Sequence, residues 1–267
     1  MITSTQNPQI KFIRSLSKRK FREENGCFFI EGLRSVGEGI KSGANIRTLI
    51  LAESFVKSEF YAEFKKTADS VDFVPTESVL FEVTDEVYRS VTETETPQGI
   101  GAVFEIPKAA SITGDSIIML ENLQDPGNMG TIIRTADAAG FDAIICTKGC
   151  VDVYNSKVLR STTGSVFHIP VLQLPGSGGI GGIADALHAK GYLLYAAHPR
   201  GEVSCFDEPF AGKSVIVIGN EANGLSDEML SHCDRLVTIP MPGQAESLNA
   251  SVAAALLIYE KRRKNMK

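Results

Sequence analysis

The chain is poor in the side chains that most often build metal and disulfide sites. Its 267 residues include four histidines, five cysteines and no tryptophan. The odd number of cysteines and the lack of a C-x-x-C pair argue against a disulfide framework or a zinc ribbon. The histidines are scattered, and none lies four residues from another metal-type ligand. We therefore expect buried or reduced thiols and no metal site.

Long apolar runs and a targeting leader are also missing. The longest uncharged apolar stretch, Val252 to Tyr259, is far shorter than the ~20 residues of a membrane-spanning helix. Residues 1–8 contain neither an apolar core nor a small-residue cleavage site. With 43% hydrophobic residues the chain can bury a sizeable core, which excludes disordered and fibrous classes. We expect a cytoplasmic protein that does not cross a membrane.

Charge is distributed unevenly along the chain. The formal net charge of −5 argues against a protein that wraps nucleic acid with its whole surface. The first 22 residues, however, contain six basic side chains and no acidic one. This local concentration predicts either a solvated helix face or an element that contacts phosphates, and the residues alone leave both interpretations open.

The front of the chain reads as a small α/β domain. Asn7 and Pro8 are typical of a helix start, and Ile10, Ile13, Leu16 and Phe21 form an apolar stripe on a helix that ends near Gly26. Further apolar patterns predict strands at 28–30, 46–51 and 71–74, and helices at 33–40 and 59–68. We expect this domain to occupy residues 1–106, followed by a linker at 107–114.

The second part of the chain, residues 115–267, reads as a larger α/β domain. Continuous apolar runs predict strands at 116–120, 143–146, 192–197, 215–218 and 236–239. Because these runs do not alternate with polar residues, the strands should be covered on both faces, as in a largely parallel sheet. Helices fit between them at 130–139, 156–163, 183–190, 227–231 and 247–263.

A glycine-dense stretch at 176–181 matches the dinucleotide fingerprint G-x-G-x-x-G. Pro175 interrupts the turn, and the next predicted strand ends in His198 and Pro199 without the acidic residue that binds the ribose. A flexible loop is therefore the favoured interpretation. A nicotinamide-dependent oxidoreductase remains the weaker alternative.

Three other segments place polar residues and glycines at the carboxyl ends of predicted parallel strands, where open α/β sheets bind ligands. In the first segment Asn128 is predicted to cap the following helix, with Arg134 about two turns further along. In the second, Gly219 and Gly224 allow unusual dihedral angles and a close approach of the backbone to a ligand. In the third, Ser247 is predicted to cap the long terminal helix.

These segments carry a resemblance to a known family. The patterns N-x-G-x-x-x-R at 128–134, G-N-E-x-x-G-L at 219–225 and I-P-M-x-G-x-x-x-S-L-N-x-S at 239–251 resemble the three ordered motifs of the SpoU-type (TrmH) RNA 2′-O-ribose methyltransferases of the SPOUT superfamily. The resemblance covers about residues 115–260. More loosely, the segments 7–8, 29–32 and 96–99 resemble the ribosomal-protein-like domain with which members of this family bind their substrates.

The resemblance implies a C-terminal trefoil knot whose loops hold S-adenosylmethionine, and a homodimer formed through the knotted domain. The residues that it assigns to the cofactor are Ala197, Gly219, Ile239, Met241 and Leu248. Those that it assigns to the active centre are Asn128, Arg134, Glu221, Ser247 and Asn249. In the front domain, our candidates for contacts with RNA phosphates are Lys11, Arg14, Lys18, Arg19 and Lys20.

The reaction that the resemblance implies requires removal of a proton from a ribose 2′-hydroxyl. A guanidinium group is effectively always protonated, so we expect Arg134 to anchor the adjacent phosphate and to stabilise the developing alkoxide. Ser247, Glu221 or a water would then complete proton removal. The expected substrate is large-subunit ribosomal RNA. The alternatives are a tRNA ribose methyltransferase and a non-catalytic RNA-binding assembly protein on the same fold.

Overall fold

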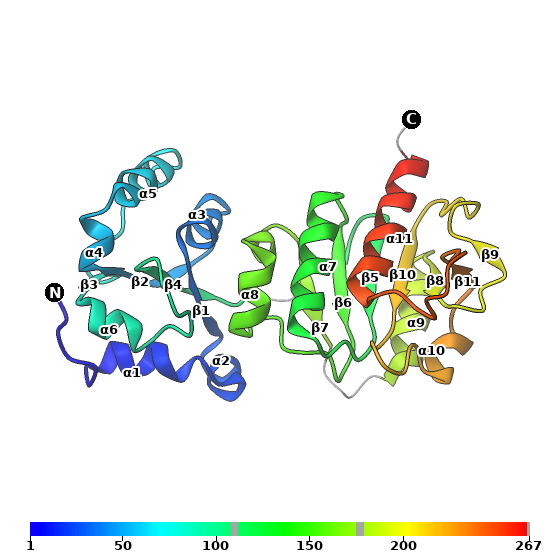
Figure 1. The fold of residues 1–267 in the computed structure, drawn as a ribbon, viewed down its shortest axis with the longest axis horizontal. Helices are drawn as coiled ribbons and strands as arrows, with labels where there is room; N and C mark the ends of the chain where they lie inside the picture. Colours follow the sequence, from blue (N-terminus) through cyan, green and yellow to red (C-terminus); the bar gives the residue numbers. More distant parts are fainter. Residues whose placement is uncertain (108–111, 175–178, 266–267) are drawn as a thin grey trace. The chain divides into compact units, whose positions relative to one another are not determined.

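The computed structural model describes residues 1–107, 112–174 and 179–265 (Figure 1). The chain divides into two compact units. The first comprises Met1–Lys108 together with Tyr154–His168, and the second comprises Ala109–Val153 together with Ile169–Lys267. Among the described residues, no helix has the length and apolar character needed to span a membrane.

The first unit is built on a four-stranded sheet with the order β1-β4-β2-β3. The central strand β4 is antiparallel to both of its neighbours, whereas β2 and β3 are parallel. The strands are β1 (Cys27–Glu31), β2 (Ile46–Ala52), β3 (Leu80–Val83) and β4 (Ile100–Glu105). The helices are α1 (Pro8–Ser15), α2 (Arg19–Asn25), α3 (Leu33–Lys41), α4 (Glu53–Val56), α5 (Glu59–Asp69), α6 (Asp85–Arg89), α8 (Ser156–Thr162) and the short 3₁₀ helix η1 (Ser165–Phe167).

The predicted first helix is two helices. The start was predicted correctly, since the Asn7 side chain accepts a hydrogen bond from the Gln9 N–H at 2.9 Å. The end at Gly26 was also correct, because this residue adopts a φ of 60° and closes α2. Between them the chain breaks after Ser15, and Phe21 is 37% exposed rather than part of the apolar stripe.

The predicted strand at 71–74 is wrong. Asp72 adopts a φ of 52°, and the Phe73 N–H donates back to the Ala68 carbonyl at 2.9 Å, so this segment closes α5 instead of extending. Val74 is 84% exposed, because an apolar side chain just past the helix end finds no sheet to cover it. The strand that pairs with β2 here is β3, from Leu80 to Val83.

Residues 154–168 follow the expected boundary at 115 in sequence but pack into the first unit. The rings of Phe28 and Tyr154 lie 4.7 Å apart, and those of Phe104 and Phe167 also lie 4.7 Å apart. Packing of these aromatic rings against β1 and β4 explains why α8 belongs to the first unit, although the residues just before it belong to the second unit. Each compact unit is therefore made of two separate stretches of the chain. Part of the expected linker, residues 108–111, lies outside the described residues.

The second unit is a seven-stranded sheet with the order β7-β6-β5-β10-β8-β11-β9, and every paired strand in it is parallel. This confirms the prediction of a parallel sheet. The strands are β5 (Ser116–Leu120), β6 (Ala143–Cys146), β7 (Val171–Gln173), β8 (Leu193–Ala197), β9 (Val203–Ser204), β10 (Ser214–Ile218) and β11 (Arg235–Thr238). Its helices are α7 (Pro126–Ala138), α9 (Gly179–Ala189), α10 (Asp227–Ser231) and α11 (Ala250–Asn265).

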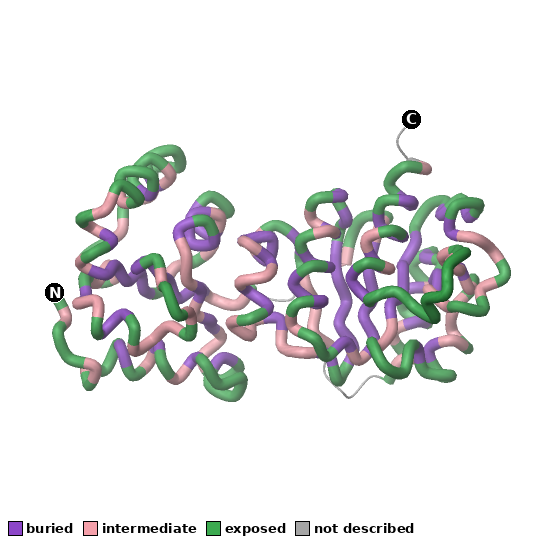
Figure 2. Tube along the Cα trace, viewed as in Figure 1, coloured by how far each residue is buried: buried purple, intermediate pink, exposed green. Residues whose placement is uncertain are grey.

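The central strands of this sheet are buried along almost their whole length, as the purple tube in Figure 2 shows. Since β10, β8 and β11 are adjacent and parallel, their carboxyl ends meet at one edge of the sheet. That edge is where open α/β sheets bind ligands. The glycine-dense stretch at 176–181 was predicted to be a flexible loop. Its first residues lie outside the described residues, which exclude 175–178, and Gly181 lies within α9.

Candidate functional site

A cavity of about 380 Å³ opens at the carboxyl ends of β8, β10 and β11. It is lined by residues from four segments, within 197–199, 218–225, 237–241 and 247–253. All five residues that the sequence assigned to the cofactor contribute to its wall: Ala197, Gly219, Ile239, Met241 and Leu248. The fold thus brings together residues that lie up to 51 positions apart in the sequence.

The lining of the cavity is mostly apolar with a few polar groups. Ile218, Leu225 and Val237 cover its inner wall, whereas Glu221 and Ser247 supply polar atoms. The volume lies within the range of about 300–1,000 Å³ that is typical of small-molecule sites. An apolar wall with sparse polar groups suits an adenine ring with a charged tail, so the residues present fit S-adenosylmethionine.

Gly219 is required by its own loop. Asn220 and Gly224 exchange backbone hydrogen bonds of 2.9 Å in both directions, which folds the loop after β10 into a tight turn. A Cβ atom on Gly219 would lie 2.3 Å from the carbonyl carbon of Gly224. The turn therefore requires a glycine at 219, and Gly224 needs its freedom for a φ of 67°. The close approach of a ligand to Gly219 stays a prediction.

Glu221 joins this loop to the start of α7. One carboxylate oxygen accepts from Asn128 Nδ2 at 3.0 Å and from the Asp125 N–H at 3.1 Å, and the other accepts from the Gln124 N–H at 3.3 Å. Burial of the Glu221 carboxyl is the largest single influence on its pKa and raises it, because burial disfavours the charged form. The hydrogen bonds from Asn128, its own backbone, Asp125 and Gln124 together outweigh it and lower the pKa of Glu221. A carboxylate with these donors is held as an anion and makes a poor proton acceptor.

Asn128 and Asn249 extend this connection to the terminal helix. Asn249 Nδ2 donates to Asn128 Oδ1 at 3.0 Å, and Asn249 Oδ1 accepts from the Ser251 N–H at 2.9 Å and from Ser251 Oγ at 2.7 Å. Glu221, Asn128 and Asn249 therefore form one continuous hydrogen-bonded relay. Each of these three residues comes from a different one of the three sequence motifs.

Both predicted helix caps are wrong by a few residues. Asp125, rather than Asn128, caps α7, since its side chain accepts from the Asn128 N–H at 2.7 Å. Asn249, rather than Ser247, precedes the first turn of α11, and its carbonyl accepts from the Ala253 N–H at 2.9 Å. The side-chain amide of Asn128 bonds to Glu221 and Asn249 instead of capping α7.

Sequence reasoning missed two further residues of this site. Glu121 is only 6% exposed, and its carboxylate accepts from the Ser226 N–H at 2.9 Å and from Ser226 Oγ at 2.6 Å. Asn220 Nδ2 donates to the Asn122 carbonyl at 2.8 Å. Both bonds tie the loop after β5 to the loop after β10. An acidic residue directly after a buried strand was the signal that could have revealed Glu121.

The side chains of Arg134 and Ser247 are exposed, and neither makes a hydrogen bond or an ion pair with another residue of the described part of the chain. Ser247 lines the cavity together with Glu221. Arg134 lies on the outer side of α7 and does not line it. Of the predicted catalytic residues, the structure therefore joins Asn128, Glu221 and Asn249 directly, and leaves the guanidinium and the hydroxyl available to a substrate.

The basic residues of the N-terminal segment differ in their hydrogen-bond and ion-pair partners. Arg14 donates to the Ser90 carbonyl at 3.1 Å and to Ser90 Oγ at 2.9 Å. Arg19 and Lys20 lie 2.7 and 3.8 Å from the carboxylates of Glu23 and Glu24. The exposed Lys11 and Lys18 have no ion-pair partner among the described residues. The acids that follow the basic run thus neutralise part of it, as expected for a solvated helix face.

Parallel topology, a cavity at the strand ends and a polar relay beside it define an α/β enzyme that binds a nucleoside-type ligand. The SpoU rRNA Methylase family matches residues 115–259, and the MRM3-like substrate binding domain matches residues 7–102. The chain belongs to the SpoU rRNA methylase family.

Relatives match over nearly the whole chain. The 23S rRNA (guanosine(2553)-2′-O)-methyltransferase RlmP of Bacillus subtilis is 35% identical over 263 residues, which cover 98% of each chain. The crystal structure of the SpoU methyltransferase AviRb from Streptomyces viridochromogenes, in complex with AdoMet, superposes with a TM-score of 0.86 at 30% identity and covers 98% of this chain and 99% of that one. The AdoMet-bound rRNA methyltransferase from Sinorhizobium meliloti gives a TM-score of 0.82 at 29% identity, covering 100% and 98%.

Proposed function

We propose that this protein transfers a methyl group from S-adenosylmethionine to a ribose 2′-hydroxyl in large-subunit ribosomal RNA. It is an S-adenosylmethionine-dependent RNA 2′-O-methyltransferase of the SpoU family. The observation that carries the proposal is the cavity at the strand ends, whose wall contains all five residues that the family resemblance assigns to the cofactor. The match of residues 7–102 to a substrate-binding domain supports ribosomal RNA over tRNA.

When bound, S-adenosylmethionine supplies a methyl group on a positively charged sulfur. Among the residues of this chain, Ala197, Ile239, Met241 and Leu248 bind the cofactor and exclude water from it. The relay from Glu221 through Asn128 to Asn249 positions the loops of the three motifs against one another. Preorganisation of this kind lowers the cost of aligning the reacting atoms.

Arg134 and Ser247 are the residues that contact the RNA. The unpaired guanidinium of Arg134 binds the phosphate next to the target ribose and stabilises negative charge that develops on the 2′-oxygen. A water takes up the proton and the Ser247 hydroxyl orients that water, because a neutral serine is too weak a base and the carboxylate of Glu221 is already occupied by its donors. The trefoil knot that the resemblance implies stays a prediction.

The proposal is tested by calorimetric titration of the purified protein with S-adenosylmethionine and, separately, with NAD, followed by methyl transfer to unmodified cellular RNA. We expect binding of S-adenosylmethionine alone and label in a ribose-methylated nucleotide of the large-subunit RNA. Binding of NAD alone would revive the oxidoreductase alternative. Absence of S-adenosylmethionine binding would favour a non-catalytic RNA-binding protein, and label in tRNA alone would replace the substrate.

A homodimer through the second unit is part of the same proposal. Along α11 the large apolar side chains of Val252, Leu256 and Tyr259 are 48%, 38% and 52% exposed, and with Phe206 they line an open groove. This spacing places them on one face of the helix. We expect Leu256→Asp to convert a dimer into a monomer in sedimentation, whereas Val71→Asp, at an exposed apolar residue of the first unit, should leave the dimer intact. A wild-type chain that sediments as a monomer would contradict the dimer.

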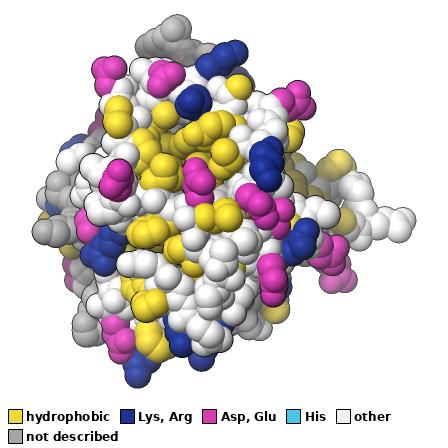
Figure 3. Space-filling model, turned by 90° about the vertical axis from the view of Figure 1, so that its left-hand side faces the viewer, with side chains coloured by type: hydrophobic (Ala, Val, Ile, Leu, Met, Phe, Trp, Pro, Cys, Tyr) yellow, Lys and Arg dark blue, Asp and Glu magenta, His cyan; other side chains and the backbone are white. Residues whose placement is uncertain are grey.

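We further propose that the N-terminal basic residues bind RNA phosphates. On the face shown in Figure 3, acidic and basic side chains are interspersed around an apolar patch, so the contacts should come from discrete residues rather than a broad basic surface. Reversing the charge of Lys11, Lys18 and Lys20 to glutamate should weaken RNA binding and reduce the slope of log affinity against log salt by about 2. Filter binding at several salt concentrations measures both quantities.

The matched control reverses three exposed lysines, Lys57 just after α4 and Lys65 and Lys66 on α5. It changes the net charge of the protein by the same amount at another place. If both triple variants lose the same affinity, the effect comes from overall charge and the assignment of Lys11, Lys18 and Lys20 is wrong.

A further inference from the structure

The first unit contains a cavity of its own, with a volume of about 190 Å³. It lies among α1, β1, the segment 90–93 and α8, and every residue that lines it belongs to the first unit. It is therefore separate from the cofactor cavity, whose lining belongs to the second unit. Of the residues given a role above, Arg14, a candidate for contacts with RNA phosphates, lines this cavity.

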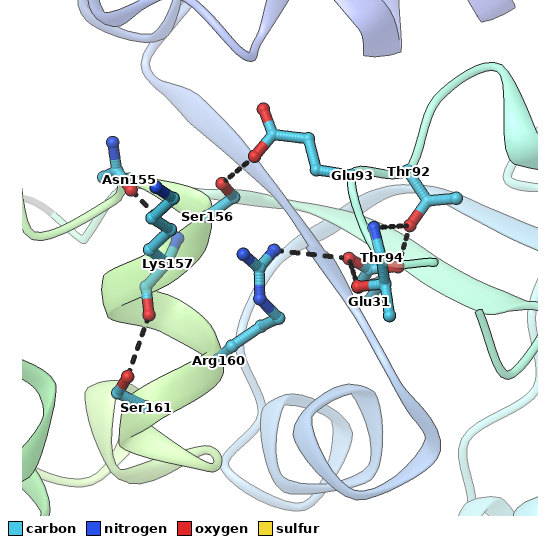
Figure 4. A network of polar contacts seen from close by, with 9 residues as sticks. All are labelled: Glu31, Thr92, Glu93, Thr94, Asn155, Ser156, Lys157, Arg160 and Ser161. Atoms are coloured by element: carbon cyan, nitrogen blue, oxygen red, sulfur yellow. Dashed lines mark hydrogen bonds and ion pairs between the residues drawn. The ribbon is translucent and has the colours of Figure 1, made fainter. Parts of the chain in front are cut away.

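Glu31 and Arg160 form the charged wall of this cavity. Figure 4 shows Arg160 extending from α8 toward Glu31 on β1. The Glu31 carboxylate accepts hydrogen bonds from the hydroxyls of Thr92 and Thr94, the latter at 2.5 Å. Arg160 Nη1 lies 3.5 Å from Glu31 Oε1 as an ion pair.

Arg160 Nη1 is buried and has no hydrogen-bond acceptor among the described residues, although the side chain as a whole is 35% exposed. Buried polar atoms in folded proteins nearly always have a partner. The buried Nη1 is thus held by Glu31, and the exposed part of the guanidinium can donate to an acceptor from outside the chain. Phosphate oxygens and base carbonyl oxygens are such acceptors.

The rest of the lining matches the parts of a nucleotide. Arg14 uses two of its nitrogens on Ser90 and keeps further N–H groups. Glu93 accepts from Ser156 Oγ at 2.5 Å and is otherwise exposed, so its carboxylate can accept from the amino or imino groups of a base. Phe29 and Tyr154 contribute aromatic surface on which a base can stack.

We propose that this cavity binds one unpaired nucleotide of the RNA substrate. The inference rests on the proposed function, and it identifies the kind of RNA structure that the first unit recognises. Proteins read RNA sequence mainly through bases that have left the stack, because the major groove of an RNA duplex is too narrow for side chains. The arginines bind the backbone of the nucleotide, and the carboxylates and aromatic rings bind its base.

The test blocks the cavity without removing any charged group. Ser17 lines it, is exposed, and donates its hydroxyl only to the Arg14 carbonyl within its own turn, at 2.9 Å. Ser17→Phe should therefore occupy the cavity. Ser42→Phe is the matched control, because Ser42 is also exposed after a helix and donates to the Gly39 carbonyl at 2.8 Å, but does not line the cavity.

The probe is an unmodified transcript of large-subunit ribosomal RNA. We expect Ser17→Phe to weaken its binding and raise its KM by about tenfold or more, as for loss of one stacked base, with kcat and the affinity for S-adenosylmethionine unchanged. Ser42→Phe should behave as the wild type. Wild-type RNA affinity in Ser17→Phe would overturn the inference, whereas a wild-type protein that fails to bind S-adenosylmethionine would overturn the proposed function instead.

A second measurement decides the matter if Ser17→Phe unfolds, which a thermal melt would reveal. A transcript that contains 4-thiouridine is cross-linked by light to the wild-type protein, and the attached peptides are mapped. Cross-links to the peptides that contain Phe29 or Tyr154 are expected. Cross-links confined to other peptides of the first unit would show that the cavity stays outside the RNA interface.

Discussion

Replacing Arg134 with alanine is expected to lower the rate of methyl transfer by about a hundredfold or more, while the affinity for S-adenosylmethionine stays the same. The loss of one preorganised charged donor at a developing oxyanion typically costs about 10²–10³ in rate. Arg134 has no ion pair within the described part of the chain, and it does not line the cofactor cavity. The substitution should therefore remove a contact with the RNA and leave the fold and cofactor site intact.

Arg134→Lys separates two explanations of the same loss. Lysine keeps the positive charge but cannot form two parallel hydrogen bonds to a phosphate, so we expect at least a tenfold reduction of kcat/KM for RNA. The matched control is Arg235→Ala, which removes an exposed arginine from β11 of the same unit. Near-normal turnover by Arg134→Lys would show that charge alone suffices and that bidentate anchoring is wrong.

Glu221→Gln is expected to lower both methyl transfer and stability, because the side chain is an anion that accepts from three donors on another loop. A glutamine offers one accepting oxygen, and its NH₂ group faces at least one of these N–H groups. The rate should fall about tenfold or more, since the loops after β5 and β10 lose one of the connections that hold them together. Initial rates and calorimetry with S-adenosylmethionine measure the effect on catalysis and on cofactor affinity.

The stability difference between the wild type and Glu221→Gln should depend on pH in a defined direction. Folding lowers the pKa of Glu221 below its ordinary value of 4.5, so the carboxylate stabilises the folded state at any pH above that value. This contribution is lost as the pH falls through the lowered pKa of the folded protein. Urea unfolding should show a constant difference near pH 7 that shrinks on acidification below pH 4.5.

The control for this series is Asp185→Asn, which neutralises an exposed carboxylate on α9. Its stability should follow the wild type over the same pH range. A difference for Glu221→Gln that grows on acidification would mean that the carboxylate does not stabilise the folded state through its hydrogen bonds.

Much of the second unit could be predicted from local pattern. The apolar runs predicted the strands at 116–120 and 143–146 with the bounds that the structure shows, because strands buried on both faces cannot alternate with polar residues. The α10 helix, from Asp227 to Ser231, was also predicted correctly. Pattern was less reliable at 71–74, where a positive φ at Asp72 turned a β-like run into the end of a helix.

The sequence by itself determined which chemical groups stand at the strand ends, and its motifs indicated which of them belong to one site. Only the tertiary structure decided how they connect. The side-chain amide of Asn249 bonds to that of Asn128, 121 positions away, and both helices start at other residues than the predicted caps. Likewise Glu31 meets Arg160 only because aromatic packing draws residues 154–168 into the first unit. Hydrogen bonds and ring contacts between distant residues depend on the packed sheet, so no local pattern could specify them.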